Sequence, residues 1–156
     1  IIKQSLILRY NIMLRNLLIM LALTASLCGA ANAEQKETVG NFDIHYMALG
    51  STFLTPSIAK TYGIERSSYR GIINIAVLDT SEAGSPAVPV EITGVANNLL
   101  DARIDLKFRE IREGEAIYYI AEVPYRDDQE INFNIAIKYR NQLNTNLQFK
   151  QKFYVE

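Results

Sequence analysis

Apolar and polar residues alternate strictly in four segments of the chain, and this pattern constrains the fold more than any other feature. Successive side chains of a strand point to opposite sides, so alternation indicates a strand with one buried and one solvated face. For example, Ile104 and Leu106 fall on one side of a strand over 103–108, and the charged residues around them fall on the other. The other alternating segments are 42–46, 131–139 and 147–155. We predict a half-buried strand in each.

Three further segments predict strands of other kinds. Residues 71–78 and 116–123 are apolar almost throughout, which favours central strands covered on both faces. Residues 88–95 form a weaker candidate, and Pro89, which has no backbone N–H to donate, places it at a sheet edge. Polar loops and turns separate the segments, at 80–86, 112–115, 126–130 and 140–144. About seven short strands at this spacing predict an all-β fold, an antiparallel β-sandwich of immunoglobulin-like size.

One short helix is expected between the first and second strands. Thr55 is a helix-capping residue, Pro56 suits the first helical turn, and Gly63 can take the left-handed conformation that ends a helix. The spacing of these residues predicts a helix of about two turns.

The first 33 residues have the three parts of a secretory signal peptide. Arg15 precedes an apolar run over 17–27, and Ala33 ends the small-residue motif at which such leaders are cut. We expect cleavage between Ala33 and Glu34, which leaves residues 34–156 as a single β-sandwich domain in the periplasm. Residues 1–12 are expected to be a gene-start artefact, because Met13 provides a natural start.

Two alternatives to cleavage stay open. A membrane anchor requires about 20 apolar residues, and the run over 17–27 is shorter. Lipid attachment at Cys28 requires a small residue before the cysteine, where the chain has Leu27. Both alternatives are therefore disfavoured.

Charge and composition exclude several functions for the mature chain. The whole chain has 16 basic and 17 acidic residues, and the leader contains Lys3, Arg9 and Arg15 and no acid, so residues 34–156 have 13 against 17, a net charge of −4. A nucleic-acid partner is not expected, because such proteins need a basic surface to displace counterions from phosphates. The single cysteine lies in the leader, so no disulfide or thiol chemistry is expected after cleavage.

Three stretches of the sequence resemble one known family. They are 51–71 (STFLTPSIAKTYGIERSSYRG), 108–125 (FREIREGEAIYYIAEVPY) and 147–155 (LQFKQKFYV). Together they resemble the proteobacterial domain of unknown function 4426 family, over essentially the whole mature chain. The resemblance implies an exported, periplasmic, single-domain β protein of unassigned activity, and it supplies no catalytic residues. The long N-terminal extension departs from the family pattern.

His45 is the one imidazole of the chain, so any mechanism that uses histidine must pass through it. Asp43 and Met47 share its strand face, and Asp43 is placed to orient the ring. We favour instead a structural histidine on the outward face of an edge strand, because the chain has no Gly-x-Ser-x-Gly nucleophile motif. One histidine and no mature cysteine cannot supply a zinc or copper site, so no metal and no cofactor are expected.

Two acidic clusters are candidates for other chemistry. The Glu110 to Glu115 hairpin contains three glutamates, the residue type that glycoside hydrolysis uses in pairs. Asp127 and Asp128 are candidates for weak Ca²⁺ binding, although they lack EF-hand spacing. Both clusters are typical of solvated turns, and Arg109 and Arg112 lie close enough in sequence to pair with the glutamates.

Adjacent tyrosines, Tyr118 and Tyr119, must point to opposite faces of their strand. One of them therefore lies outside the main core, either packed beneath a loop, which we favour, or in a binding face.

The segment that joins the predicted helix to the second strand contains a candidate contact site, Arg66, Tyr69 and Arg70. Two arginines around a tyrosine can hold a carboxylate or phosphate through planar, bidentate hydrogen bonds. The alternative, which we favour, is structural: the arginines pair with Glu65 or with the Glu110 to Glu115 hairpin and pin the helix to the sandwich.

These observations favour a non-catalytic periplasmic binding or interaction module, whose partner is an envelope protein or an anionic ligand. The alternative is a small envelope hydrolase that uses carboxylates of the Glu110 to Glu115 hairpin. No stable membrane span is expected after processing.

Overall fold

The computed structural model describes residues 35–100 and 102–155. The predicted signal peptide over 1–33, the start at Met13 and the cleavage point between Ala33 and Glu34 lie outside these residues. In chain order the described elements are β1 (Gln35–Val39), β2 (Phe42–Gly50), the 3-10 helix η1 (Ser51–Phe53), α2 (Pro56–Thr61), β3 (Arg70–Asp79), β4 (Glu91–Asn98), β5 (Arg103–Leu106), β6 (Arg109–Glu113), β7 (Ala116–Pro124), β8 (Gln129–Tyr139) and β9 (Leu143–Phe153).

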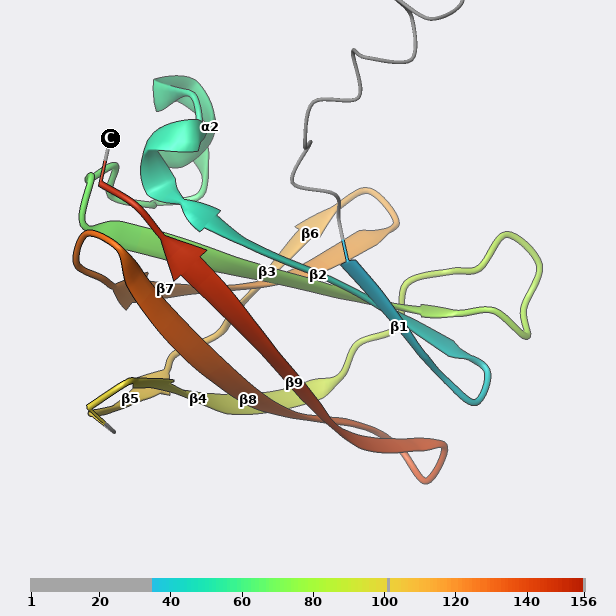
Figure 1. The fold of residues 1–156 in the computed structure, drawn as a ribbon. Coiled ribbons are helices and arrows are strands. Elements are labelled where there is room, and N and C mark those ends of the chain that lie inside the picture. The colour runs from blue at the N-terminus through green and yellow to red at the C-terminus, as the bar shows by residue number, and fades with distance from the viewer. Residues whose placement is uncertain (1–34, 101, 156) are drawn as a thin grey trace, which may run out of the picture. The chain divides into compact units, whose positions relative to one another are not determined.

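The strands form two antiparallel sheets that pack face to face (Figure 1). The five-stranded sheet has the order β1-β2-β3-β7-β6, and the four-stranded sheet has the order β5-β4-β8-β9. The predicted all-β sandwich is thus confirmed, with nine strands in the described residues where about seven were predicted.

The first additional strand is β1, whose sequence QKETV is polar except for its last residue and shows no apolar alternation. Backbone pairing with β2 defines it, from Gln35 opposite Tyr46 to Val39 opposite Phe42. A strand held by backbone hydrogen bonds at a sheet edge leaves little trace in the hydrophobic pattern, because it buries few side chains.

The second additional strand arises because the segment predicted as one strand over 103–108 is divided. β5 ends at Leu106 in the four-stranded sheet, and β6 begins at Arg109 in the other sheet. Lys107 and Phe108 carry the chain between the sheets. The alternating pattern continues through this change of sheet, so periodicity alone could not reveal it.

The structure also corrects the prediction that 88–95 is an edge strand. β4 begins at Glu91, two residues after Pro89, and lies between β5 and β8. Pro89 belongs to the segment before the strand, where its missing N–H interrupts no ladder hydrogen bond. The two segments predicted to be central are central, because β3 lies in the middle of its sheet and β7 lies between β3 and β6.

The inner faces of the two sheets form the main core. Phe133 stacks on Phe149 with 4.8 Å between ring centroids, and Tyr125 stacks on Phe153 at 4.6 Å. Each buried aliphatic side chain between them contributes about 1.5–3 kcal/mol to folding. The large aliphatic residues that are fully buried are Ile44, Ile73, Ile75, Val77, Val123, Ile131, Ile135, Ile137 and Leu147.

The short helix α2 begins and ends as predicted. The Oγ1 of Thr55 accepts a hydrogen bond from the N–H of Ile58 at 3.3 Å, and Pro56 is the first helical residue. Gly63 has a φ of +61°, which a residue with a side chain rarely adopts.

A second, smaller apolar cluster lies where the helical segment covers the outer face of the five-stranded sheet (Figure 1). Ala59 of the helix packs there with Ile72 and Ile120 of the sheet, and Tyr118 packs against them. Tyr119 belongs to the main core. The adjacent tyrosines therefore occupy opposite faces, as predicted, and Tyr118 packs in the cluster with the helical segment, where a covering loop was predicted.

Candidate functional site

The exposed large apolar side chains of residues 35–100 and 102–155 gather at one end of the sandwich. They are Phe53 (60% exposed), Ile58 (44%), Tyr69 (60%), Leu99 (75%), Leu100 (89%) and Tyr154 (57%). All six lie in α2 or in segments next to strand ends: after β2, before β3, after β4 and after β9. We call this set the apolar end. Clustered exposed apolar residues indicate an interaction surface, whereas scattered ones do not.

Strand register places these segments at the same end of the two sheets. The relevant pairs are Gly50 with Gly71, Gly71 with Val123, Asn98 with Ile131, and Gln129 with Phe153. The two sheets meet there through the stacked rings of Tyr125 and Phe153. In Figure 1, α2 and the end of β9 lie at the upper left of the sandwich, and the end of β4 lies at the lower left.

Tyr125 connects three aromatic residues of the apolar end. Its backbone N–H donates to the carbonyl of Tyr69 at 2.9 Å, and its hydroxyl donates to the carbonyl of Tyr154 at 3.3 Å. A Cβ atom at Gly50 would lie 3.1 Å from the Tyr125 hydroxyl and 3.6 Å from Cδ2 of Phe53, so these two groups flank one point. Buried Tyr125 thus fixes the backbone that carries the exposed rings.

Ser51 fixes the loop that leads to Tyr69. Its side chain is fully buried, and its Oγ accepts a hydrogen bond from the N–H of Ser67 at 2.9 Å and donates one to the Ser67 carbonyl at 3.1 Å. The backbone N–H and the backbone carbonyl of Ser67 therefore both bond to the Ser51 hydroxyl, which lies just after β2. This pairing holds the loop against the sheet and positions Tyr69.

The three residues predicted as a contact site take different roles. Arg70 forms ion pairs with Glu65 at 3.0 Å and with Glu122 at 3.1 Å, so both terminal nitrogens of its guanidinium face carboxylates of the chain. Nη2 of Arg66 donates to a backbone carbonyl, that of Thr52, at 3.0 Å. Tyr69 is exposed. Arg70 thus pairs with Glu65, one of the partners that the sequence suggested. The second carboxylate that pairs with Arg70 belongs to Glu122 on β7, not to the Glu110 to Glu115 hairpin.

Asp127 and Asp128 fasten the segment that contains Tyr154. Oδ1 of Asp127 accepts from the N–H of Val155 at 2.9 Å, and Oδ1 of Asp128 lies 2.7 Å from Nζ of Lys152. The hydrogen bond to Asp128 raises the pKa of Lys152, whose ammonium also lies 5.4 Å from the centroid of the Tyr154 ring. The two carboxylates serve separate contacts and do not converge as ligands of one cation.

His45 lies on β2, which is flanked by β1 and β3, so the expectation that its strand is an edge strand is wrong. The reason is β1, which the hydrophobic pattern did not reveal. The carboxylate of Asp43, on the same strand face, accepts from Thr38 at 2.6 Å and from Lys36 at 3.0 Å, and these hydrogen bonds lower the pKa of Asp43. The structure describes no group of three or more His, Cys, Asp or Glu residues arranged to hold a metal ion in 35–100 and 102–155.

The glutamates of the Glu110 to Glu115 hairpin do not converge. Glu110 lies opposite Tyr119 in the pairing of β6 with β7. Its carboxylate accepts a hydrogen bond from the Tyr119 hydroxyl at 3.0 Å, on the sheet face that is turned toward the main core. Glu113, three residues along β6 and so on the other face, accepts from the hydroxyl of Tyr62. A hydrogen bond from Arg112 and another from Tyr119 lower the pKa of Glu110, whereas a catalytic acid needs a raised pKa.

Sequence reasoning found Tyr69 but missed the rest of the apolar end. Leu99 and Leu100 follow the last residue of β4, and Tyr154 follows the last residue of β9. Apolar residues just beyond the point where a strand pattern stops are the signal that was available. It becomes informative only when the topology shows which strand ends lie together.

A protein-family model, the domain of unknown function DUF4426, matches residues 36–156. The chain belongs to the DUF4426 family. The solved structure of a DUF4426 family protein from Pseudomonas aeruginosa PAO1 is similar, with 29% sequence identity and a TM-score of 0.68 over 79% of this chain and 96% of that one. The predicted resemblance is therefore confirmed. Comparison with curated proteins gives no significant match.

Two structures of FetP from uropathogenic Escherichia coli strain F11 share the fold of this DUF4426 protein. One is a copper-bound glutamate-to-glutamine variant, and the other is the protein as isolated after recombinant expression in the periplasm of E. coli. Each has 10% sequence identity and a TM-score of 0.55 over 78% of this chain, and the coverage of FetP is 95% and 94%. At this identity the likeness shows the fold alone.

Helices long and apolar enough to cross a bilayer are absent from the residues that the structure describes.

Proposed function

We propose that this DUF4426 protein is a non-catalytic periplasmic interaction module that binds an envelope protein through its apolar end. The observation that carries the proposal is that all six exposed large apolar residues of the described chain lie at the same end of the two sheets. Three of them, Phe53, Tyr69 and Tyr154, are aromatic; buried Tyr125 donates hydrogen bonds to the backbone carbonyls of Tyr69 and Tyr154, and its hydroxyl lies near Phe53. Aromatic residues held on a rigid scaffold are typical of the residues that dominate binding energy at protein interfaces.

A protein partner is favoured over a small anion because of how the arginines are engaged. Arg70 is paired with two carboxylates of the chain, so its fork is not open to a phosphate or carboxylate ligand. Arg66 lies closer to solvent and keeps donors beyond its bond to the Thr52 carbonyl, so it can contribute at the rim of an interface. Apolar contact with the rings then supplies most of the binding energy.

A hydrolase is not proposed, because Glu110 and Glu113 lie on opposite faces of β6 and the pKa of Glu110 is lowered. Copper binding stays a property of FetP. The chain has one histidine, and no metal-ligating cluster occurs in the described residues to accompany it.

Export to the periplasm rests on the leader sequence. Mass spectrometry of protein purified from the cell envelope tests it, with an N-terminus at Glu34 expected. An intact leader, or a lipid on Cys28, would contradict this part of the proposal.

A comparison of variants by crosslinking and pull-down from intact cells tests the interaction. Replacing Phe53, Tyr69 and Tyr154 together by serine should abolish the crosslinked partner species while leaving the fold intact, because these side chains are mainly exposed. The matched control replaces Glu82 and Gln142, exposed residues of the loops at the opposite end, by alanine and should retain the crosslinks. Equal capture by the two variants would contradict the proposal.

A further inference from the structure

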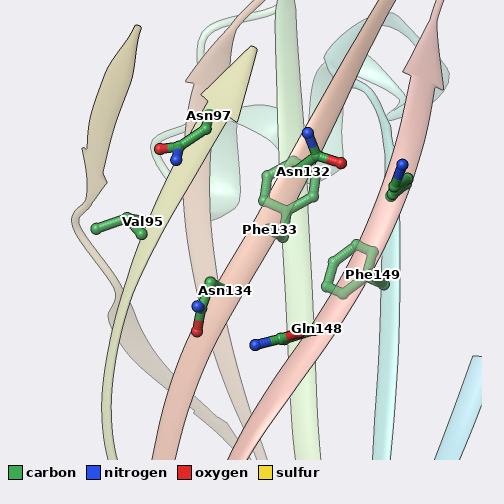
Figure 2. Close-up of a pocket in the computed structure, with 8 residues that line it drawn as sticks. Val95, Asn97, Asn132, Phe133, Asn134, Gln148 and Phe149 are labelled. Atoms are coloured by element: carbon green, nitrogen blue, oxygen red, sulfur yellow. The ribbon is translucent and has the colours of Figure 1, made fainter. Parts of the chain in front are cut away.

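The outer face of the four-stranded sheet carries an array of uncharged amides. Alternation along the strands turns these side chains away from the main core, and Figure 2 shows the amides of Asn97, Asn132, Asn134 and Gln148 projecting from three adjacent strands. The outward-facing residues of this region are Thr93, Val95, Asn97, Asn132, Asn134, Ala136, Asn146, Gln148 and Lys150.

Strand register sets these amides in rows. Asn97 of β4 lies directly opposite Asn132 of β8, and Asn134 of β8 lies opposite Gln148 of β9. Neighbouring strands are about 4.8 Å apart, so the amides within a row stand at a short, regular spacing. The regular spacing suits a ligand that repeats its own polar groups along its length.

The hydrogen-bonding capacity of the array is unused within the described chain. The side-chain amides of Asn132, Asn134 and Gln148 make no hydrogen bond to residues in 35–100 or 102–155, and Oδ1 of Asn97 is shielded from solvent with no hydrogen-bond partner in the same residues. Each amide offers two donors and one acceptor group. The terminal torsion of asparagine is soft, so either end of the Asn97 amide can turn toward the surface.

Two shallow depressions follow the array. One of ≈ 440 Å³ is lined by Asn97, Asn132 and Gln148, and its neighbour of ≈ 430 Å³ reaches Arg103 of β5; both include Val95 and Asn134. The two therefore form one continuous trough across the strands. A trough that is open along a sheet face suits an extended chain laid on it, whereas a small molecule is usually enclosed on most sides.

The chemistry of the trough selects among extended ligands. Protein interfaces concentrate aromatic, methionine and arginine side chains at their centre. Phe133 and Phe149 also line the trough, but they stack on each other in the main core, so amides and Val95 make up most of what the trough presents to a ligand. Nucleic acids require a group of free cations, and the two cations of the trough are paired: Lys150 lies 3.6 Å from Glu130, and Arg103 lies 3.1 Å from Asp105. Amides that both donate and accept are suited to hydroxyl and acetamido groups, which also do both.

We propose that this trough binds an uncharged glycan chain. The sugar hydroxyl or acetamido groups hydrogen-bond to the amides of Asn97, Asn132, Asn134 and Gln148, and Val95 contacts an apolar sugar face. The trough shares no residue with the apolar end. Glycan binding would therefore be a second function of the molecule, and its test does not depend on whether the apolar end binds a protein partner.

Titration of the ¹⁵N-labelled protein with chitohexaose and with cellohexaose tests the proposal. We expect millimolar or tighter binding of at least one of these uncharged chains, with shifts confined to the side-chain NH₂ signals of the trough. Selective binding of chitohexaose would assign acetamido recognition, and equal binding would assign hydroxyl recognition. Absence of shifts with both sugars, or shifts located at Phe53 and Tyr69 instead, would overturn it.

Variants separate recognition from folding. Alanine at Asn97, Asn132 and Gln148 together should weaken binding about tenfold or more, since each lost hydrogen bond contributes part of the affinity. Asn134→Asp keeps the shape of the side chain and replaces its donors with a charge. Because Asn134 is exposed, we expect this variant to keep the fold and to weaken binding. The matched control replaces Asn141 and Gln142, exposed amides of the β8–β9 turn, by alanine. Unchanged affinity in the triple variant and in Asn134→Asp would overturn the proposal.

Discussion

Replacing Ser51 by alanine is expected to destabilise the fold through the loop that carries Tyr69. The hydroxyl of Ser51 is fully buried and serves both the N–H and the carbonyl of Ser67, at 2.9 and 3.1 Å. Alanine leaves the N–H of Ser67 without this partner, and a buried group left unsatisfied costs about 1–3 kcal/mol. The Ser67 carbonyl still accepts from the backbone N–H of Arg70 at 3.1 Å, and Ser67 is half-buried, so we expect a loss of about 1–2 kcal/mol in total.

Urea unfolding at equilibrium measures this loss as a lower midpoint with an unchanged slope, because the surface exposed on unfolding stays the same. Ser57→Ala is the matched control, because Ser57 is exposed in α2 and its hydroxyl makes no hydrogen bond within the described residues. This variant should change the free energy of unfolding by less than about 0.5 kcal/mol. A loss in Ser51→Ala as small as that of the control would refute the role given to Ser51.

Three further predictions concern other contacts of the structure. Arg66→Ala combined with Arg70→Ala should lower the free energy of unfolding by about 1 kcal/mol in thermal or urea unfolding, because partly exposed ion pairs contribute little. This double variant should retain the partner crosslinks, and their loss with unchanged stability would restore the anion-binding hypothesis. Gly71→Ala should destabilise by about 1–3 kcal/mol, because its Cβ would lie 2.7 Å from Cε1 of Phe153, and Phe153→Leu should relieve part of the loss if this contact is the cause. NMR should show that the Glu110 carboxyl titrates with a pKa below its ordinary value of 4.5. The contribution of this carboxylate to stability is therefore complete above pH 4.5 and is lost as the pH falls through the lower pKa of the folded state. A pKa above 4.5 would reopen the hydrolase hypothesis.

The sandwich could be predicted because its core strands bury one face and alternate, as in β8, where Ile131, Phe133 and Ile135 point inward. The helix could be predicted for a similarly local reason, since Thr55 and Gly63 act through the backbone next to them. Both signals depend on residues close in sequence, which is why a single sequence contains them.

The strand count and the edges could not be predicted, because they depend on pairing between distant segments. β1 is polar and is held by β2, and this pairing makes the strand of His45 an internal one. The turn of the chain from one sheet to the other at Lys107 and Phe108 leaves the alternation undisturbed. Such features are properties of the topology rather than of local composition.

The candidate site was predictable only in part, for the same reason. Tyr69 stood out between two arginines in sequence, whereas Phe53 and Tyr154 lie 101 positions apart and come together only through Tyr125. The pairing of Arg70 with Glu65 was among the favoured alternatives, whereas its second partner, Glu122, could not be predicted because it lies on β7. Pairing with acids of the Glu110 to Glu115 hairpin was expected from the turn composition, but β7 lies between β3 and the hairpin strand β6.

The claim that the apolar end is the partner-binding surface is tested most directly by site-specific photocrosslinking in intact cells. A photoreactive residue is placed singly at Tyr69 and, in a separate protein, at Glu82 in the loop at the opposite end. We expect a discrete crosslinked species of higher mass from position 69 that is absent from position 82. Crosslinking from position 82 alone, or an equal yield from the two positions, would contradict it.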